Sequence, residues 1–315
     1  MKNFYSNIYS FNLRILKKTV KYLSQGNLVA IPTETVYGLA GNAYSKKAVK
    51  NIFKLKNRPK KNPLIIHYHN ISDAQKDVIF NKNFFLLYKK FCPGPLTFIL
   101  KKSKNSKITP FANSSLKTVA IRFPKNRIIR SVLKSIKFPL AMPSANLSSG
   151  LSPVNALDVF EEFKKKINII IDGGNANIGI ESTVVDLTGK PKILRPGTIT
   201  KSKLSRFFKI DFSNNKSAIK SPGMLKKHYS PGIPVILNKK PKYSNHAYIV
   251  FGKKFENYKN YFNLSKKADL KQAAANLYKT MRKIKKNGYK KIYVIKIPNK
   301  GLGVAINDRL KRASN

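Results

Sequence analysis

Residues 28–39 read LVAIPTETVYGL, an apolar run that is followed directly by hydroxyl, carboxyl and phenol side chains. The run from Leu28 to Pro32 predicts a buried strand, and Gly38 permits a tight turn. Ligands of α/β proteins bind near the ends of strands. The polar residues after this strand therefore predict one wall of a pocket, although an ordinary turn with capping hydroxyls is the better explanation of this motif taken alone.

Strand-like and helix-like segments alternate on both sides of this motif up to about residue 200, which predicts an α/β fold. Gly26 marks the end of a preceding helix, and Ser45 is expected to cap the next one. Helices are also predicted near Ile128–Ile136 and Ala156–Lys164. Strands are predicted at Leu64–Ile66, Leu96–Leu100, Val119–Ile121, Ile169–Ile171, Thr183–Leu187 and Ile193–Leu194, which together indicate a large mixed sheet.

The apolar periodicity decays between about Lys201 and Pro234, where Lys, Ser, Asn, Pro and Gly dominate, and this predicts a linker. Beyond it, strands at Tyr248–Phe251 and Ile292–Ile295 flank a helix over Asp269–Lys286. This strand–helix–strand unit is long enough for a crossover between parallel strands. We therefore predict a first domain over residues 1–205, a linker over 206–234 and a small α/β domain over 235–315.

The 63 basic residues outnumber the 13 acidic ones and give a net charge of +50. Such a charge attracts polyanions and makes their binding dependent on salt. Only 10 of the 63 basic residues are Arg, and the Lys excess runs through every segment together with many Asn and Ile. Specific phosphate and base contacts favour Arg, so we prefer a bias in codon composition to a dedicated nucleic-acid surface as the explanation.

Cysteine content and hydropathy indicate the cellular setting. The single cysteine, Cys92, excludes an intramolecular disulfide and a Cys-based zinc cluster, which favours a reducing compartment. No run reaches the roughly 18 to 20 apolar residues of a membrane span. Arg14, Lys17 and Lys18 interrupt the first apolar run. We therefore expect a soluble, cytoplasmic protein without a signal peptide.

Two cations close the helix predicted before the strand at Leu64–Ile66. Neither a GxxxxGK[ST] loop nor a GxGxxG motif is present, so a nucleotide would have to be bound in another way. Lys56 supplies a point charge and Arg58 a planar fork, a pair suited to a triphosphate. The same pair complements the helix dipole, which in so basic a chain is the better explanation unless other motifs support a site.

Further polar clusters follow the other predicted strands, and each could also be a plain turn. Arg122 stands at the end of a strand, where it can pair with a carboxylate. A linker rarely needs His and Tyr side by side, yet His228 and Tyr229 are adjacent. The remaining clusters are Met142–Asn146 with Ser148–Ser152, Asp172–Gly174, Glu181–Thr183 and Leu194–Gly197.

Taken together, these strings resemble the YrdC/YciO family and, within it, the two-domain Sua-five type of threonylcarbamoyl-AMP synthase. Each string is weak alone, but their common order and spacing are specific. Ser221–Pro231 resembles the interdomain linker of that type, and Ala305–Leu310 resembles the signature that closes its second domain. The other strings that carry the resemblance are Thr33–Leu39, Lys56-x-Arg58, Asn62–Leu64, Pro93–Thr97, Ser144–Asn146 and Glu181–Thr183.

The resemblance implies a YrdC-like twisted mixed sheet flanked by helices, with a large basic concave cavity and a small Rossmann-like α/β C-terminal domain. It implies a nucleotidyltransferase that condenses L-threonine, bicarbonate and ATP to L-threonylcarbamoyladenylate and pyrophosphate. The product would serve the formation of N6-threonylcarbamoyladenosine (t6A) at position 37 of tRNAs that read ANN codons. The implied macromolecular partners are tRNA or a downstream t6A transferase complex, and no membrane is involved.

The resemblance also assigns roles to single residues. Lys56 and Arg58 would neutralise the leaving pyrophosphate together with Mg2+, which the ATP phosphates would carry without assigned protein ligands. No covalent intermediate is implied, so Cys92 would be a bystander. The residues expected around threonine are Thr35, His67, Arg122, Met142 and Ser182. Those expected around ATP are Lys56, Arg58, Asn62, Thr118, Ser144, Ser152, Arg195 and Tyr229, the last as part of a lid.

Two other functions compete with this one. A tRNA-binding or double-stranded-RNA-binding protein would also suit the charge and the implied cavity, and the salt dependence of binding would distinguish it. A carbamoyl-transfer module of a larger maturation enzyme would be accompanied by acylphosphatase and zinc-finger regions. A single cysteine cannot supply the zinc-finger region.

Overall fold

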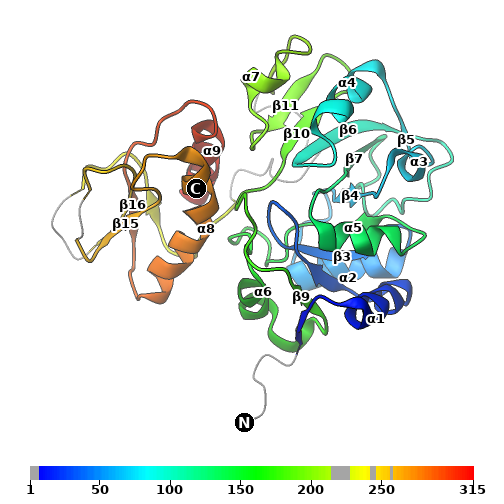
Figure 1. Ribbon diagram of the computed structural model, residues 1–315, viewed down its shortest axis with the longest axis horizontal. Helices are drawn as coiled ribbons and strands as arrows, with labels where there is room; N and C mark the ends of the chain where they lie inside the picture. Colours follow the sequence, from blue (N-terminus) through cyan, green and yellow to red (C-terminus); the bar gives the residue numbers. More distant parts are fainter. Residues whose placement is uncertain (1–6, 214–227, 242–245, 256–257) are drawn as a thin grey trace.

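The computed structural model describes residues 7–213, 228–241, 246–255 and 258–315. Figure 1 shows two α/β units, the first built on a large sheet and the second on a small one. The large sheet mixes parallel and antiparallel pairs, and the small sheet is parallel throughout. The α/β class and the large mixed sheet predicted from the sequence are thus confirmed.

The large sheet has 12 strands in the order β1-β9-β2-β3-β8-β4-β7-β6-β10-β11-β12, with β5 paired to β6. Its strands are β1 (Ile8–Ser10), β2 (Val29–Ile31), β3 (Gly38–Asn42), β4 (Ile65–His67), β5 (Val78–Ile79), β6 (Leu96–Lys102), β7 (Thr118–Arg122), β8 (Leu140–Ala141), β9 (Ile170–Asp172), β10 (Thr183–Asp186), β11 (Lys192–Arg195) and β12 (Asp211–Phe212).

Helices cover both faces of this sheet because successive strand residues point to opposite sides. Val29 and Ile31 of β2 pack in one apolar cluster with α1 and α5, whereas Ala30 belongs to another cluster with α2, α4 and α6. The helices of this unit are α1 (Leu13–Ser24), α2 (Lys46–Lys56), α3 (Ile71–Ala74), α4 (Lys82–Phe91), α5 (Arg127–Lys134), α6 (Ala156–Phe163), the 3-10 turn Lys164–Lys166 and α7 (Lys201–Leu204).

Two helix boundaries are set by the residues that the sequence singled out. The Ser45 side chain accepts a hydrogen bond from the backbone N–H of Ala48 and caps α2. Gly26 follows α1 with φ of +80°, a left-handed conformation that glycine adopts without strain. Both predictions are confirmed.

The segment of decayed periodicity is structured at its start, over residues 201–212, and the strand within it falls inside the predicted linker of residues 206–234. α7 forms there, and β12 pairs in parallel with β11, opposite Lys192 and Ile193. Leu204 and Ile210 are buried in the core of the first unit. Phe207 and Phe208 pack against the same core, so these apolar side chains hold a segment whose many lysines and serines obscure any periodicity. Residues 214–227, and with them Ser221–Lys227 of the linker motif, lie outside the described residues.

The second unit has four parallel strands in the order β13-β16-β14-β15. The predicted parallel pairing of β14 and β16 is confirmed, Tyr248 opposite Tyr293, but a further parallel strand, β15, lies between β14 and α8, so the helix connects β15 to β16. The elements are β13 (Val235–Ile236), β14 (Ala247–Val250), β15 (Tyr261–Asn263), α8 (Leu270–Lys286), β16 (Ile292–Val294) and α9 (Gly303–Ala313).

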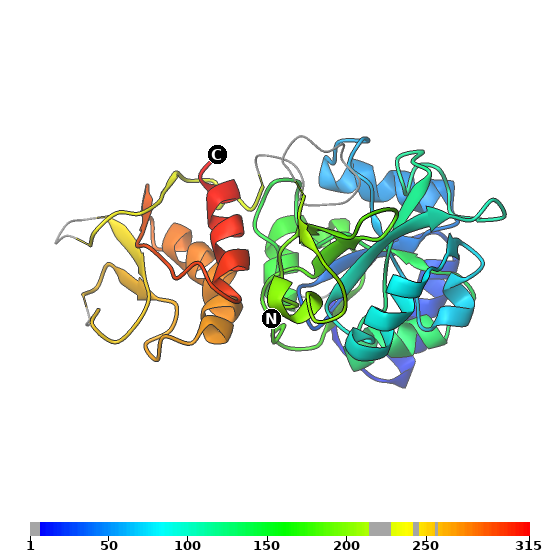
Figure 2. The same ribbon diagram turned by 90° about the horizontal axis from the view of Figure 1, so that it is seen from above.

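Both helices of the second unit lie on the side that faces the first unit (Figures 1 and 2). Their buried residues, among them Leu277 and Ile306, form one apolar cluster with Val154 and Ile180 of the first unit. The two units therefore share a continuous apolar interface. Within the described ranges, no helix is long and apolar enough to cross a membrane.

Gly197 allows the turn after β11 to pass close to the start of β10. A Cβ on Gly197 would lie 2.5 Å from the backbone N of Thr183 and 2.8 Å from the carbonyl C of Ser182. Gly197→Ala is therefore expected to lower the free energy of unfolding by about 1–3 kcal/mol, because backbone has to shift. Urea unfolding measures this change. Gly189→Ala is the matched control, since a Cβ there meets nothing within 4 Å; equal effects would contradict the prediction.

Candidate functional site

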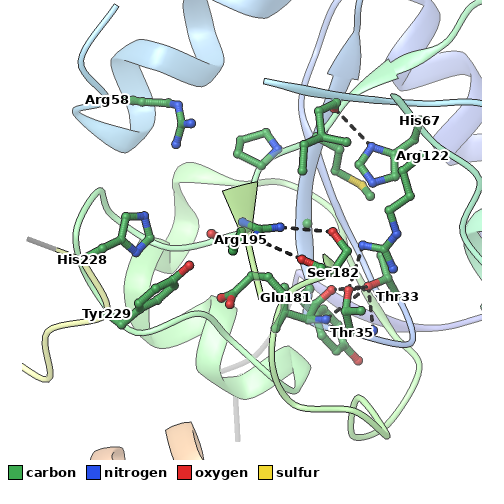
Figure 3. A pocket seen from close by; sticks show the side chains of 17 residues that line it. Thr33, Thr35, Arg58, His67, Arg122, Glu181, Ser182, Arg195, His228 and Tyr229 are labelled. Carbon is green, nitrogen blue, oxygen red and sulfur yellow. Dashed lines mark hydrogen bonds between the residues drawn. The ribbon is translucent and has the colours of Figure 1, made fainter. Parts of the chain in front are cut away.

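A cavity lies over the same face of the large sheet as α1 and α5, beyond the area that these helices cover. Figure 3 shows the side chains that line it. The side chains of Ile65 and His67 point into it from β4, whereas Ile66 between them belongs to the core on the opposite face. The cavity is lined by Thr33, Thr35, Val36, Tyr37, Gly38, Arg58, Ile65, His67, Arg122, Met142, Pro143, Ser144, Glu181, Ser182, Arg195, His228 and Tyr229.

One side of the cavity is built around Arg122, the last residue of β7. Its Nη2 donates to Glu34 Oε1 at 2.7 Å, and its Nη1 donates to Thr35 Oγ1 at 2.9 Å. Burial opposes the ionisation of Glu34, but the guanidinium of Arg122 lowers the pKa of that carboxyl below its ordinary value. Arg122 is thus held by the motif after β2 as a fixed, charge-compensated donor.

His67 lies beside Arg122 because β4 and β7 pair in parallel with these two residues opposite each other. Burial and the positive charge of Arg122 lower the pKa of His67 to about 3. Its Nδ1 lies 3.2 Å from the carbonyl O of Ile65. The imidazole is therefore neutral at physiological pH and offers a hydrogen bond without charge.

The middle of the cavity is formed by Ser182 and Arg195. The guanidinium of Arg195 donates to the carbonyl O and to Oγ of Ser182, each at 3.1 Å. Ser182 Oγ also lies 2.8 Å from Thr97 Oγ1, which the register of β6 places opposite Arg122. These contacts link the two sides of the cavity through buried side chains.

The opposite side of the cavity carries Arg58, which follows α2. Arg58 donates from Nε to the carbonyl O of Asn62 at 2.9 Å and from Nη2 to that of Pro63 at 3.0 Å. Burial and the nearby charge of Arg195 lower the pKa of Arg58 to about 9, which leaves the guanidinium protonated at neutral pH. Two fixed cations, Arg58 and Arg195, therefore face the same space (Figure 3).

His228 and Tyr229 cover the cavity on the side of Arg58 (Figure 3). Tyr229 is 1% exposed, and its hydroxyl has no hydrogen-bond partner among the described residues. The backbone N–H of Ser230 donates to the carbonyl O of Ser149 at 2.8 Å and fixes this segment to the first unit. With both rings in place the cavity has a volume of about 40 Å3.

Glu181 is the carboxylate that the cavity wall contains between these two sides. Its Oε1 accepts from Ser152 Oγ at 2.5 Å, and its Oε2 accepts from Arg309 Nε at 3.0 Å. Burial would raise the pKa of Glu181, but Arg309, Arg195 and the Ser152 hydrogen bond lower it to about 2. The group is therefore ionised and already satisfied by protein donors.

The structure brings most of the predicted site residues into one wall. The predicted residues that line the cavity are Thr35, Arg58, His67, Arg122, Met142, Ser144, Ser182, Arg195 and Tyr229. These residues come from segments spread over the sequence from residue 35 to residue 229, and most follow or end a strand.

Four predicted residues are not in that wall. Lys56 is 1% exposed and donates from Nζ to the carbonyl O of Ser144 at 2.6 Å and to that of Asn146. It therefore supports the turn that carries Ser144, and its own burial lowers its pKa well below the ordinary value. The expectation that Lys56 contacts the phosphates directly does not fit this arrangement.

The other three stand behind the wall or beyond it. Asn62 is buried, and its carbonyl accepts from Arg58. Ser152 is fully buried, and its hydroxyl donates to Glu181. Thr118 lies on the same face of β7 as Arg122, but at the opposite end of that strand.

Some residues of the cavity lie in the sequence motifs but have no predicted role. Thr33 is one, and its Oγ1 lies 2.8 Å from Thr35 Oγ1 and donates to the carbonyl O of Val36 at 2.6 Å. Glu181 and His228 were recognised only as parts of motifs, although the scarcity of acidic residues was a signal for Glu181. Arg309, which reaches Glu181 from the second unit, belongs to the closing signature and had no predicted role.

The Cys92 thiol is not activated for nucleophilic attack. Burial raises the pKa of Cys92 to about 12, so its thiol is protonated. In the part of the chain that the structure describes, no group of three or more His, Cys, Asp and Glu side chains is placed to hold a metal ion. The cavity instead offers fixed cations and hydroxyls, which suit anionic ligands.

Comparison with known proteins identifies the family. A family model described as telomere recombination, of the Sua-five, YciO and YrdC type, matches residues 21–197. A second model, described as the C-terminal domain of threonylcarbamoyl-AMP synthase, matches residues 199–315. The threonylcarbamoyl-AMP synthase of Pyrococcus abyssi is 36% identical over 93% of this chain and 92% of its own. That of Bacillus subtilis is 35% identical over 93% of this chain and 90% of its own.

A solved structure agrees in fold over almost the whole chain. The crystal structure of the P. abyssi Sua-five protein complexed with L-threonine has a TM-score of 0.89 to this structure at 34% identity. The match covers 98% of this chain and 97% of that one. The chain therefore belongs to the threonylcarbamoyl-AMP synthases, in their two-domain Sua-five type.

Proposed function

We propose that this chain condenses L-threonine, bicarbonate and ATP to L-threonylcarbamoyladenylate and pyrophosphate in the cavity over the large sheet. The family membership gives the reaction class, a nucleotidyltransferase that serves t6A formation in tRNA. The observation that carries the assignment of the site is the separation of its cations. Arg122 stands on one side of the cavity and Arg58 on the other, with Ser182 and Arg195 between them.

Threonine occupies the side of Arg122 in this proposal. The guanidinium, already fixed by Glu34 and Thr35, faces the amino-acid carboxylate, and the neutral His67 offers a hydrogen bond. Met142 and Ser182 complete the wall. The support from a relative is that the P. abyssi Sua-five protein is described in complex with L-threonine.

ATP occupies the side of Arg58, Ser144 and Arg195 in this proposal. Lys56 acts from behind by holding the Ser144 turn, and Asn62 orients Arg58 through its carbonyl. Ser152 and Thr118 stay predicted nucleotide contacts that require ATP to extend beyond the described cavity. Tyr229 covers the nucleotide. A volume of about 40 Å3 is far below the roughly 300–1,000 Å3 of ordinary ligand pockets, so His228 and Tyr229 have to move for ATP to enter.

The chemistry in this proposal is positioning and electrostatic stabilisation. The threonine amine attacks the carbon of bicarbonate, and water leaves as the carbamate forms. A carbamate oxygen then attacks the α-phosphorus, the bond from that phosphorus to the bridging oxygen breaks, and pyrophosphate leaves with its charge stabilised by Arg58. Closure by Tyr229 excludes water from the carbamate and the mixed anhydride, both of which are labile. Magnesium, brought by the ATP phosphates, would add positive charge at the leaving group. Glu34 and Glu181 are already paired with Arg122 and Arg309. This pairing fits a magnesium ion that is held by the ATP phosphates and not by protein carboxylates.

The direct test of the reaction is pyrophosphate release from ATP by the purified chain with magnesium. Release that requires both threonine and bicarbonate is expected. Pyrophosphate release without threonine and bicarbonate would contradict the proposed reaction, and so would the absence of any release. The partners tRNA and a downstream transferase complex, the site on tRNA and the cytoplasmic location stay predictions.

Arg122→Gln is expected to weaken threonine binding by about tenfold to a hundredfold, because the positive charge that faces the threonine carboxylate is lost and Glu34 is left uncompensated. Isothermal calorimetry with threonine measures the affinity. Arg130→Gln is the matched control, since Arg130 donates to the carbonyl O of His69 and does not line the cavity. A similar loss in both variants would argue against a threonine carboxylate at Arg122.

The pH dependence of threonine binding reports the charge of His67. Since burial lowers its pKa to about 3, His67 is neutral from pH 5.5 to 8, and the threonine affinity is expected to be flat over this range. Calorimetry across the range measures it. An affinity that rises below about pH 6.5, the ordinary pKa of His, would mean that the imidazolium binds the carboxylate instead.

Tyr229→Ala is expected to raise adenylate hydrolysis or leakage more than it weakens threonine binding, because the ring covers the nucleotide side of the cavity. Trapping of the adenylate product gives the first quantity and calorimetry gives the second. If the fold-loss in threonine affinity equals the fold-rise in adenylate hydrolysis, Tyr229 serves the whole cavity and not its nucleotide side.

A further inference from the structure

The carboxylate of Glu181 is an anion in a cavity that suits anionic ligands. Its wall position lies between Ser182 on the threonine side and Tyr229 on the nucleotide side (Figure 3). An uncompensated carboxylate there would repel both the triphosphate and the threonine carboxylate. The counter-charge of Glu181 therefore matters for the reaction and not only for folding.

That counter-charge comes from the second unit. Arg309 of α9 donates from Nε to Glu181 Oε2 at 3.0 Å, and Tyr278 of α8 donates to the same carboxylate at 3.1 Å. Both donors are fully buried. A third side-chain donor to Glu181, Ser152, belongs to the first unit. Two elements that lie more than 90 residues away in the sequence thus hold one residue of the cavity wall.

Arg309 also contacts two further parts of the nucleotide side. Its Nη1 donates to the carbonyl O of Pro196 at 2.7 Å, directly after Arg195. The centre of its guanidinium lies 5.3 Å from the centroid of the Tyr229 ring, a cation–π contact. Asp308 accepts from Nη1 at 2.8 Å. A single buried guanidinium therefore reaches the wall, the turn after Arg195 and the ring that covers the cavity.

The same unit fixes the backbone beside Ser152. Arg282 of α8 donates to the carbonyl O of Ser152 at 2.9 Å and to that of Leu151 at 2.7 Å. The hydroxyl of Ser152 meanwhile donates to Glu181. The contacts of Arg282 and Arg309 with the cavity region thus fall on Ser152, Glu181, Pro196 and Tyr229, whereas Arg122 is held by Glu34 and Thr35 of the first unit.

We propose that Arg309 is a positioning residue for the nucleotide, through which the second unit neutralises Glu181 and holds Tyr229 and the turn after Arg195 in place. This inference rests on the proposed function, because it assigns ATP to the side of Tyr229 and Arg195. It gives the second unit a defined part in the reaction of the first. It also predicts that loss of Arg309 affects ATP more than threonine.

The test compares Arg309→Met with wild type in pyrophosphate release and in threonine calorimetry. The KM for ATP is expected to rise by about tenfold or more, because Glu181 is left as a buried, unpaired charge. The threonine Kd is expected to change by less than about twofold, since the residues around Arg122 are untouched. An unchanged KM for ATP, or equal losses for both substrates, would overturn the proposal.

A second substitution separates charge from packing. Glu181→Gln combined with Arg309→Met removes both charges, and the glutamine oxygen can still accept from Ser152 and Tyr278. The double variant is expected to recover most of the loss in the KM for ATP, which a double-mutant cycle quantifies. No recovery would mean that Arg309 acts only by packing, and the part of the proposal that concerns Glu181 would be wrong.

Lys286→Met is the matched control for the interface. It removes an exposed ion pair between the units, that of Lys286 with Glu161, which lies outside the cavity. Its KM for ATP is expected to stay within about twofold of wild type, since exposed pairs contribute little. An increase in the KM for ATP equal to that of Arg309→Met would overturn the proposal, because any weakening of the interface between the units would then raise the KM for ATP.

Tyr278→Phe covers the case in which Arg309→Met does not fold. It removes only the hydroxyl that donates to Glu181, and a rise of about threefold in the KM for ATP is expected, with threonine affinity unchanged. No rise would overturn the proposal. A failure of the proposed function is distinguishable, because the wild-type chain would then release no pyrophosphate that depends on threonine and bicarbonate.

Discussion

Charge compensation in a water-poor space is the constraint on which the site depends. A buried ion without a partner costs several kcal/mol, so each charge in the cavity wall needs a counter-charge or a set of dipoles. Glu34 provides this for Arg122, and Arg309 provides it for Glu181. These partners come from distant parts of the sequence, so the site exists only when the whole fold is formed.

This constraint also explains why the cavity can be both cationic and stable. Burial lowers the pKa of both Arg58 and Arg195, and a neighbouring guanidinium lowers it further, that of Arg195 at Arg58 and that of Arg309 at Arg195. Both guanidinium groups nevertheless stay protonated at neutral pH. Lysine in the same surroundings would lose its proton more readily, as the lowered pKa of Lys56 shows. Arginine is therefore the residue that can present fixed positive charge to a ligand here, although the chain as a whole favours lysine.

The sequence predicts the wall of the cavity better than what stands behind it. Thr35, Arg122 and Arg195 follow or end apolar runs, so their positions at the ends of strands of one sheet could be inferred from the local pattern. The direction of Lys56 could not, because whether a helix-terminal lysine turns to a ligand or to carbonyls depends on tertiary packing. The pair of Glu181 and Arg309 spans 128 residues, and nothing in local periodicity links its members. For the same reason, the buried Leu204 and Ile210 were hidden within a segment with the composition of a linker.

A carboxylate such as Glu181 repels the ligands of a cavity for anions unless protein donors neutralise it. Its oxygens collect donors from Ser152 of the first unit and from Tyr278 and Arg309 of the second. An uncharged acceptor could join the same donors but would leave the buried Arg309 with Asp308, a partner it shares with Arg312, as its remaining counter-charge. The acid and the base are therefore interdependent, and together they allow α9 to lie against the wall of the cavity and under the ring of Tyr229. The geometry of the nucleotide side is in this way a property of the interface between the two units and not of the large sheet alone.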